Sequence, residues 1–208
     1  DELDIIYTVE KKPSVTDPIE DRNAIYGQKL EDLLDFPEIS DGVWSWENKD
    51  ALVGNVGTNY FRAIFTPNDI NITPTIQEVK VIVSPKEITF NNVISTFNYD
   101  GNEHRISYTL SENPEGVIVV ETGTLSLTEY VEGGETFTLT ISGNSNYIGT
   151  YTGTIMINKV DPNMGVIPTF TTRYGETYES INMPVHSEGT WNLIDTGIIT
   201  QVGNQTVS

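Results

Sequence analysis

The chain has 208 residues, no cysteine and a formal net charge of −19, from 30 acidic and 11 basic residues. Such an acidic surface repels nucleic acid and anionic lipid, so neither is expected as a partner. The lack of cysteine excludes disulfide staples, thiolate metal sites and thiol catalysis. No run of about 18 apolar residues is present, so no membrane-inserted helix is expected.

Strand patterns dominate the chain. Ile5–Val9, Val79–Val83, Thr136–Ile141 and Thr150–Ile157 alternate or cluster β-branched and aromatic residues. The one short helical pattern, Gln28–Leu34, is too short for a helix, and its Leu30 and Leu33 are expected to be inward-facing residues of a strand or of a single turn. Short strands separated by frequent turns predict an all-β fold of β-sandwiches. The turn dipeptides are Asp41-Gly42, Gly54-Asn55, Asp100-Gly101, Gly133-Gly134 and Gly143-Asn144.

One sequence pattern occurs twice, once in each half of the chain. Residues 26–57 and 174–203 each open with Tyr-Gly, continue through a Pro-x-x-Ser-acidic-Gly-x-Trp stretch and close with Val-Gly. Repetition at this scale is typical of modules built in series and not of one catalytic core. The residues that define the repeat are Tyr26, Gly27, Trp44 and Gly57 in the first copy, and Tyr174, Gly175, Trp191 and Gly203 in the second.

Two short linkers that contain lysine and proline divide the chain. Ser84-Pro85-Lys86 and Asn158–Pro162 each follow a strand pattern. Linkers this short let modules touch one another. The predicted modules are residues 1–85, 86–160 and a partial module 161–208, with residues 1–12 either the last strand of a preceding module or the first of this one. We expect the chain to end inside a module, as a piece of a longer tandem protein.

These motifs resemble a family of bacterial surface repeats. The first module is similar to YGX-type MBG repeats, which are immunoglobulin-like modules found in tandem. The matching segments are Tyr26–Leu30, Trp44-x-Trp46, Val56–Asn59, Phe65–Asp69 and Val79–Lys86.

The second module resembles the companion YDG-type repeat, and residues from Pro162 onward return to the first type. The resemblance implies serial immunoglobulin-like β-sandwiches, two complete and one partial, in a secreted or surface-anchored bacterial protein of adhesin or stalk type. It implies no enzymatic activity. The residues that carry this second match include Tyr99, Gly101, His104 and Tyr147.

The residues alone suggest two kinds of binding site. Trp46 and Tyr60 are candidates for an exposed platform on which a sugar stacks, and Trp46 is favoured over Trp44 because its counterpart in the second copy is Leu193. Asp100, Glu103 and Asp161 are weak calcium candidates, and calcium at the two linkers is the one cofactor considered. The simpler interpretation of each is a core position or a solvated turn.

Catalysis is not expected. The two histidines, His104 and His186, fall in different modules, and the many carboxylates fall in predicted turns or on exposed strand faces. The function predicted first is a non-catalytic extracellular stalk whose partners are the neighbouring modules. One alternative is an adhesin module that binds a glycan or host protein. Another is a fibre or surface-layer subunit in which Ile5–Val9 pairs with another copy by strand donation.

Overall fold

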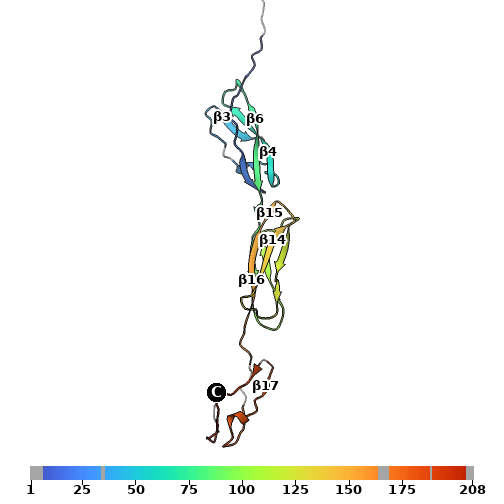
Figure 1. Ribbon diagram of the computed structural model, residues 1–208. Helices are drawn as coiled ribbons and strands as arrows, with labels where there is room; N and C mark the ends of the chain where they lie inside the picture. Colours follow the sequence, from blue (N-terminus) through green and yellow to red (C-terminus); the bar gives the residue numbers. More distant parts are fainter. Residues whose placement is uncertain (1–6, 34–35, 164–168, 188, 205–208) are drawn as a thin grey trace, which may run out of the picture. The chain divides into compact units, whose positions relative to one another are not determined.

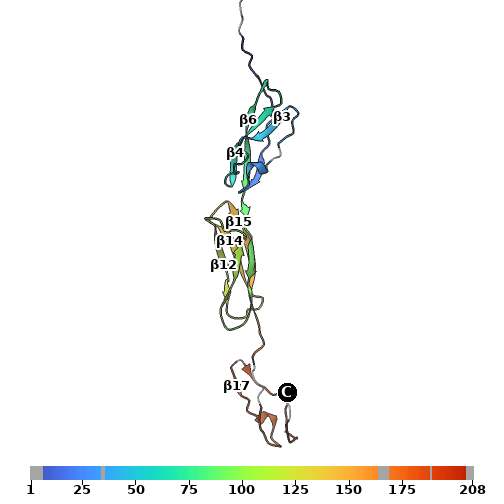
Figure 2. The ribbon, with the colours of Figure 1, turned by 180° about the vertical axis from the view of Figure 1, so that it is seen from behind.

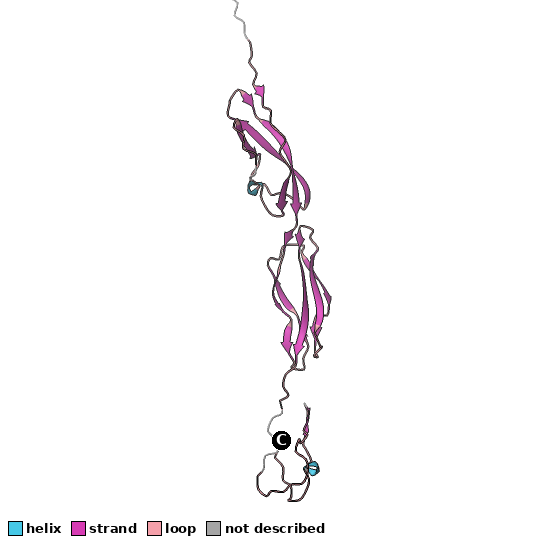
Figure 3. Cartoon of the chain, turned by 60° about the vertical axis from the view of Figure 1, so that its left-hand side comes forward, coloured by secondary structure: helices cyan, strands magenta, loops and turns pink. Residues whose placement is uncertain are grey.

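The fold is all-β in the computed structural model, which describes residues 7–33, 36–163, 169–187 and 189–204. The only helical pieces within those ranges are two single turns, η1 (Leu30–Asp32) and η2 (Tyr178–Ser180) (Figure 3). Neither is long and apolar enough to cross a membrane. Residues 1–97 and 101–157 form one compact unit, and residues 98–100 with 158–208 form another. The sequence prediction of an all-β protein is confirmed.

Residues 12–84, the first core region, are built on a four-stranded sheet. Its strand order is β2-β6-β4-β3, with β6 parallel to β2 and antiparallel to β4 (Figure 1). A second, two-residue pairing joins β1 to β5. The strands are β1 (Lys12–Pro13), β2 (Arg22–Ile25), β3 (Gly42–Trp46), β4 (Gly57–Pro67), β5 (Ile72–Thr73) and β6 (Thr75–Ser84).

The inner face of this sheet forms the first hydrophobic core. In β3 the side chains alternate between buried and exposed, as the period of two in a strand requires, so Trp44 and Trp46 both face inward. Leu30 of η1 and Val53 are buried in the same core. The remaining buried members are Ala24, Ala63, Phe65, Val79, Val81 and Val83.

Residues 86–157, the second core region, are built on another four-stranded sheet. Its order is β12-β14-β16-β9, and three two-stranded pairs, β10–β13, β11–β8 and β15–β7, accompany it. Phe137, Leu139 and Ile155 of the sheet pack with Ile106 in one core. The strands are β7 (Lys86–Glu87), β8 (Phe90–Ile94), β9 (Thr96–Asn98), β10 (His104–Arg105), β11 (Ser107–Leu110), β12 (Ile118–Gly123), β13 (Ser126–Leu127), β14 (Glu135–Ser142), β15 (Tyr147–Ile148) and β16 (Thr150–Asn158).

The strand predictions were mostly correct. Val79–Val83 lies in β6, Thr136–Ile141 in β14 and Thr150–Ile157 in β16. The predicted strand Ile5–Val9 is not formed where it can be assessed: Ile5 and Ile6 lie outside the described residues, and Tyr7 to Val9 are exposed and outside any strand. The segment proposed as a strand donor therefore has no strand structure in its described part.

Residues 158–208 contain the second copy of the repeat. Strands in its described part are limited to the two-residue pair β17 (Val185–His186) and β18 (Gly189–Thr190). The backbone nevertheless reproduces the first copy. Gly27 and Gly175 have φ values of 90° and 85°, and Gly57 and Gly203 have φ values of 117° and 111°.

Backbone hydrogen bonds recur between the copies as well. Each copy has one 3-10 turn three residues after its Tyr-Gly pair, and each joins that turn to the segment before its Val-Gly pair. The matching bonds are Leu30 N to Ala51 O and Tyr178 N to Gly197 O, both 2.9 Å, and Val53 N to Gln28 O at 3.0 Å and Ile199 N to Glu176 O at 2.8 Å. The repeat seen in the sequence is therefore also a repeat of local structure.

Candidate functional site

The predicted aromatic platform is not formed. Trp46 is 5% exposed, packs on Phe36 with ring centroids 4.9 Å apart, and donates its indole N–H to the carbonyl of Leu33 at 3.2 Å. Tyr60 is 59% exposed and lies on the outer face of the same sheet, because its neighbour Phe61 packs against the core. The two rings lie on opposite faces, so they cannot stack on one ligand.

The calcium candidates do not gather into a site. Among the described residues, no group of three or more His, Asp or Glu side chains is placed to hold a metal. Glu103 accepts a hydrogen bond from the hydroxyl of Ser126 at 2.5 Å. Asp100 and Asp161 are exposed outside any strand. His104 stacks on the ring of Phe97, with centroids 4.7 Å apart. These positions have structural partners or face solvent.

A polar trio that the sequence did not indicate lies within the second core region. Glu121 of β12 pairs with the guanidinium of Arg105 and accepts a hydrogen bond from the hydroxyl of Tyr108 at 2.8 Å. Burial, with the bond to Glu121 as a further cause, raises the pKa of Tyr108 to about 12. Glu121 thus points inward from a strand at the edge of its sheet. Inward-pointing charges at such positions discourage pairing with a foreign strand.

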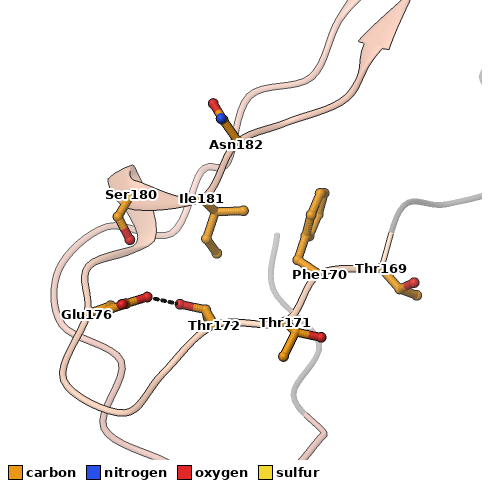
Figure 4. Close-up of a pocket in the computed structure, with 8 residues that line it drawn as sticks. All are labelled: Thr169, Phe170, Thr171, Thr172, Glu176, Ser180, Ile181 and Asn182. Atoms are coloured by element: carbon orange, nitrogen blue, oxygen red, sulfur yellow. Dashed lines mark hydrogen bonds between the residues drawn. The ribbon is translucent and has the colours of Figure 1, made fainter.

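A surface depression of about 430 Å³ lies in the second copy of the repeat (Figure 4). Phe170 and Ile181 face it, together with threonine side chains. Its one carboxylate, Glu176, accepts hydrogen bonds from the Thr172 hydroxyl at 2.7 Å and the Arg173 N–H at 3.3 Å, and these bonds lower its pKa. At the equivalent position of the first copy, the side-chain oxygen of Gln28 accepts a hydrogen bond from the Ile25 N–H at 2.7 Å. Glu176 therefore supports a turn.

A group of hydrogen bonds joins the first and second core regions at the linker between them. Only Pro85 separates β6 from β7, and its ring fixes φ at this position. On the side of the first region, the Tyr26 N–H donates to the carbonyl of Ser84 at 2.9 Å. On the side of the second region, the Lys86 N–H donates to the carbonyl of Asn146 at 3.0 Å. Both regions are therefore tied to the linker by backbone hydrogen bonds.

Side chains join the two regions directly. The side chain of Asn146 accepts a hydrogen bond from the Val56 N–H at 2.9 Å and donates one to the Asn55 side chain at 3.1 Å. Tyr26 meets Tyr147 edge to face, with ring centroids 5.3 Å apart. We call these five residues the joint. Tyr26, from the first copy of the repeat, and Tyr147, from the second core region, thus meet in a contact that the sequence did not predict.

The charged side chains of Lys86 and Glu112, near the linker, bind each other within the second core region. Lys86 donates to the carboxylate of Glu112 at 2.9 Å, and this hydrogen bond raises the pKa of Lys86. The amide and ring groups of the joint carry no charge, so the joint itself offers calcium no carboxylate ligand.

No protein-family model matches the sequence, and a search of the curated proteins gave no significant match.

Proposed function

We propose that this chain is a non-catalytic stalk or spacer segment of a secreted or cell-surface bacterial protein. In this proposal residues 1–85 and 86–160 are two complete immunoglobulin-like sandwiches, and residues 161–208 belong to a third. The internal repeat, the two separate hydrophobic cores and the motifs shared with bacterial surface repeats support it. A spacer needs modules that hold their direction, and its surface needs no reactive cleft.

The joint is the observation that carries the proposal. A one-residue linker alone limits rotation, and the joint adds two hydrogen bonds and a ring contact across the boundary. A net contribution of about 0.5–1.5 kcal/mol for each of the two hydrogen bonds and for the aromatic pair gives about 1.5–4.5 kcal/mol in all. A state in which the joint is open then has a population of about 10% or less.

The orientation of the two regions can be measured with spin labels, because the chain has no native cysteine to interfere. Cysteines introduced at Ser45 and Thr128, both exposed, place one label in each region. We expect electron–electron distance measurements to give one narrow distribution. The variant Asn146→Ala should broaden it, because both side-chain hydrogen bonds across the boundary are lost.

Asn68→Ala is the matched control. Asn68 donates a side-chain hydrogen bond to the Ser40 carbonyl at 2.9 Å, wholly within the first core region. It should leave the distribution narrow. A broad distribution in the spin-labelled protein that keeps Asn146 would refute the fixed joint, and with it the main support for the stalk.

Removing calcium provides a second test. Because the contacts of the joint are amides and rings, a chelator should leave the distance distribution unchanged. A distribution that broadens in chelator would instead place calcium at the linker, as the acidic composition first led us to consider.

A further inference from the structure

Threonines form a regular array on the outer face of the second core region. Strands β14 and β16 are antiparallel neighbours, and three threonine pairs lie directly opposite one another across them. One pair, Thr138 and Thr152, has its hydroxyl oxygens 3.3 Å apart. Strand β12 lies beside β14 on its other side (Figure 2). Thr122 of β12 is opposite Thr138 and donates a hydrogen bond to its carbonyl at 3.4 Å. The pairs across β14 and β16 are Thr136 with Thr154, Thr138 with Thr152, and Thr140 with Thr150.

The threonine face, as we call this surface, carries no charge. It consists of the outward residues of β12, β14 and β16, whose inward neighbours include Val119, Phe137 and Ile155. The chain as a whole has 30 acidic and 11 basic residues. Ile118, Val120 and Met156 at the margins of the face are 57%, 41% and 37% exposed. The members of the face are Ile118, Val120, Thr122, Thr136, Thr138, Thr140, Ser142, Thr150, Thr152, Thr154 and Met156.

The equivalent surface of the first core region is different. Its outward positions include Arg62, which pairs with Glu47 at 3.0 Å, and Lys80, which pairs with Asp21. Exposed apolar side chains occur there too, but charged cross-strand neighbours such as Arg62 and Glu78 separate them. Neutrality is therefore a property of the threonine face and not of sheet surfaces in this chain generally.

We propose that the threonine face is a contact surface for the same face of a second copy of this chain. Copies with a net charge of −19 repel one another, and contact costs least where neither surface carries charge. Short, β-branched side chains also let two sheets approach to their ordinary packing distance of about 10 Å. A surface related by a two-fold axis meets itself, so one neutral face is sufficient for a dimer.

The size of the face predicts weak association. Three strands spaced about 4.8 Å apart, with about seven residues rising about 3.3 Å each, cover about 14 by 25 Å. A stable interface buries about 800 Å² on each partner. The threonine face alone is smaller, so the contact forms and dissociates readily and gains from any tethering that raises the local concentration of the chain.

Pairing through the β12 edge of the sheet is a competing route, and the structure disfavours it. The edge strand β12 carries the inward-pointing Glu121, held by Arg105 and Tyr108. The inward-pointing charge of Glu121 disfavours the pairing of a foreign strand with this edge.

Sedimentation equilibrium of the full chain over a wide range of protein concentrations tests the proposal. We expect the average mass to rise with concentration and to rise further between about 0.05 and about 0.5 M salt, because salt screens the repulsion between acidic surfaces. Association through ion pairs would show the opposite dependence on salt.

The test variant is Thr152→Glu, which places a charge in the centre of the face, and its matched control is Thr58→Glu on the exposed outer side of β4. Both add the same charge to the chain. We expect Thr152→Glu to weaken association by about tenfold or more, a change of about 1.4 kcal/mol, and Thr58→Glu to weaken it far less. Thr122→Glu, at the margin of the same face, serves if Thr152→Glu unfolds the region by circular dichroism.

Two results would overturn the proposal. One is a monomer at every concentration in high salt, which would also be the result if the face binds a glycan or another protein in place of a second copy. The other is association that Thr152→Glu and Thr58→Glu weaken equally, which would place the contact elsewhere. Neither result bears on the joint, whose distance distribution is measured within one chain.

Discussion

The two copies of the repeat have the same local backbone and very different burial. In the first copy Trp44 is 5% exposed and lies between Phe36 and Phe65, at 6.4 and 5.4 Å between ring centroids. Its counterpart Trp191 is only half-buried, and Tyr174 is 71% exposed. Phe65 belongs to β4, which lies after the repeated segment. The repeat therefore specifies turns and part of the core, and β4, which lies almost wholly outside it, adds burial in the first copy.

Removing the repeated tryptophan should produce the largest difference between the copies. We expect Trp44→Ala to lower the free energy of unfolding of the first core region by about 3–5 kcal/mol, because it leaves a cavity among packed rings. Trp191→Ala should cost less, about 1 kcal/mol, because its ring is only half-buried. Denaturant unfolding followed by NMR signals from each region measures both, and equal losses would show that the copies are packed alike.

The repeated glycine before the tryptophan gives a smaller contrast of the same kind. A Cβ added at Gly42 would come within 2.5 Å of the Thr66 carbonyl oxygen and would also overlap the Phe65 ring, whereas a Cβ at Gly189 would meet nothing within 4 Å. We expect Gly42→Ala to cost about 1–3 kcal/mol. Gly189→Ala should leave stability unchanged in thermal unfolding. A measurable loss at Gly189 would mean that a strand like β4 covers that position.

Replacing the glycine of the Tyr-Gly turn should lower stability equally in both copies, because the two turns have the same backbone conformation. Gly27 and Gly175 both have φ near 90° and no neighbour within 4 Å of an added Cβ. Alanine at either position should cost about 1–2 kcal/mol, from left-handed backbone strain alone. Amide exchange at Val53 and Ile199, which bond to the turn in each copy, reports the loss. Asparagine, which tolerates this conformation better, should cost less at both sites, and an effect confined to one copy would contradict the shared backbone.

The smallest expected difference is in pH dependence. Glu176 and Gln28 occupy the same turn position, but only Glu176 titrates, and its pKa is lowered by hydrogen bonds from Thr172 and Arg173. Its carboxylate therefore stabilises the turn at pH above its ordinary pKa of 4.5, and this support is lost as pH falls through the lowered value. NMR titration of the Arg173 amide should show the change. Glu176→Gln should abolish it, and the Ile25 amide beside Gln28 should not titrate.

Sequence reasoning succeeded where structure depends on neighbours in the chain. The strands β6, β14 and β16 follow from alternating β-branched residues, and the Tyr-Gly turns follow from the repeat. The prediction that Trp46 is an exposed ligand platform, based on Leu193 at the equivalent position of the second copy, is wrong. Both residues are apolar, and alternation in β3 already places Trp46 on the same face as the buried Trp44.

The all-β class, the turns and the repeated local backbone follow from the amino-acid sequence, because they depend on φ/ψ preferences and on a period of two within short segments. Which side chains meet depends instead on how the strands assemble. The contact of Tyr26 with Tyr147, the pairing of Glu121 with Arg105 and the register that aligns Thr138 with Thr152 all join residues distant in sequence. Strand register and the approach of the two core regions set these contacts, and no single segment encodes either.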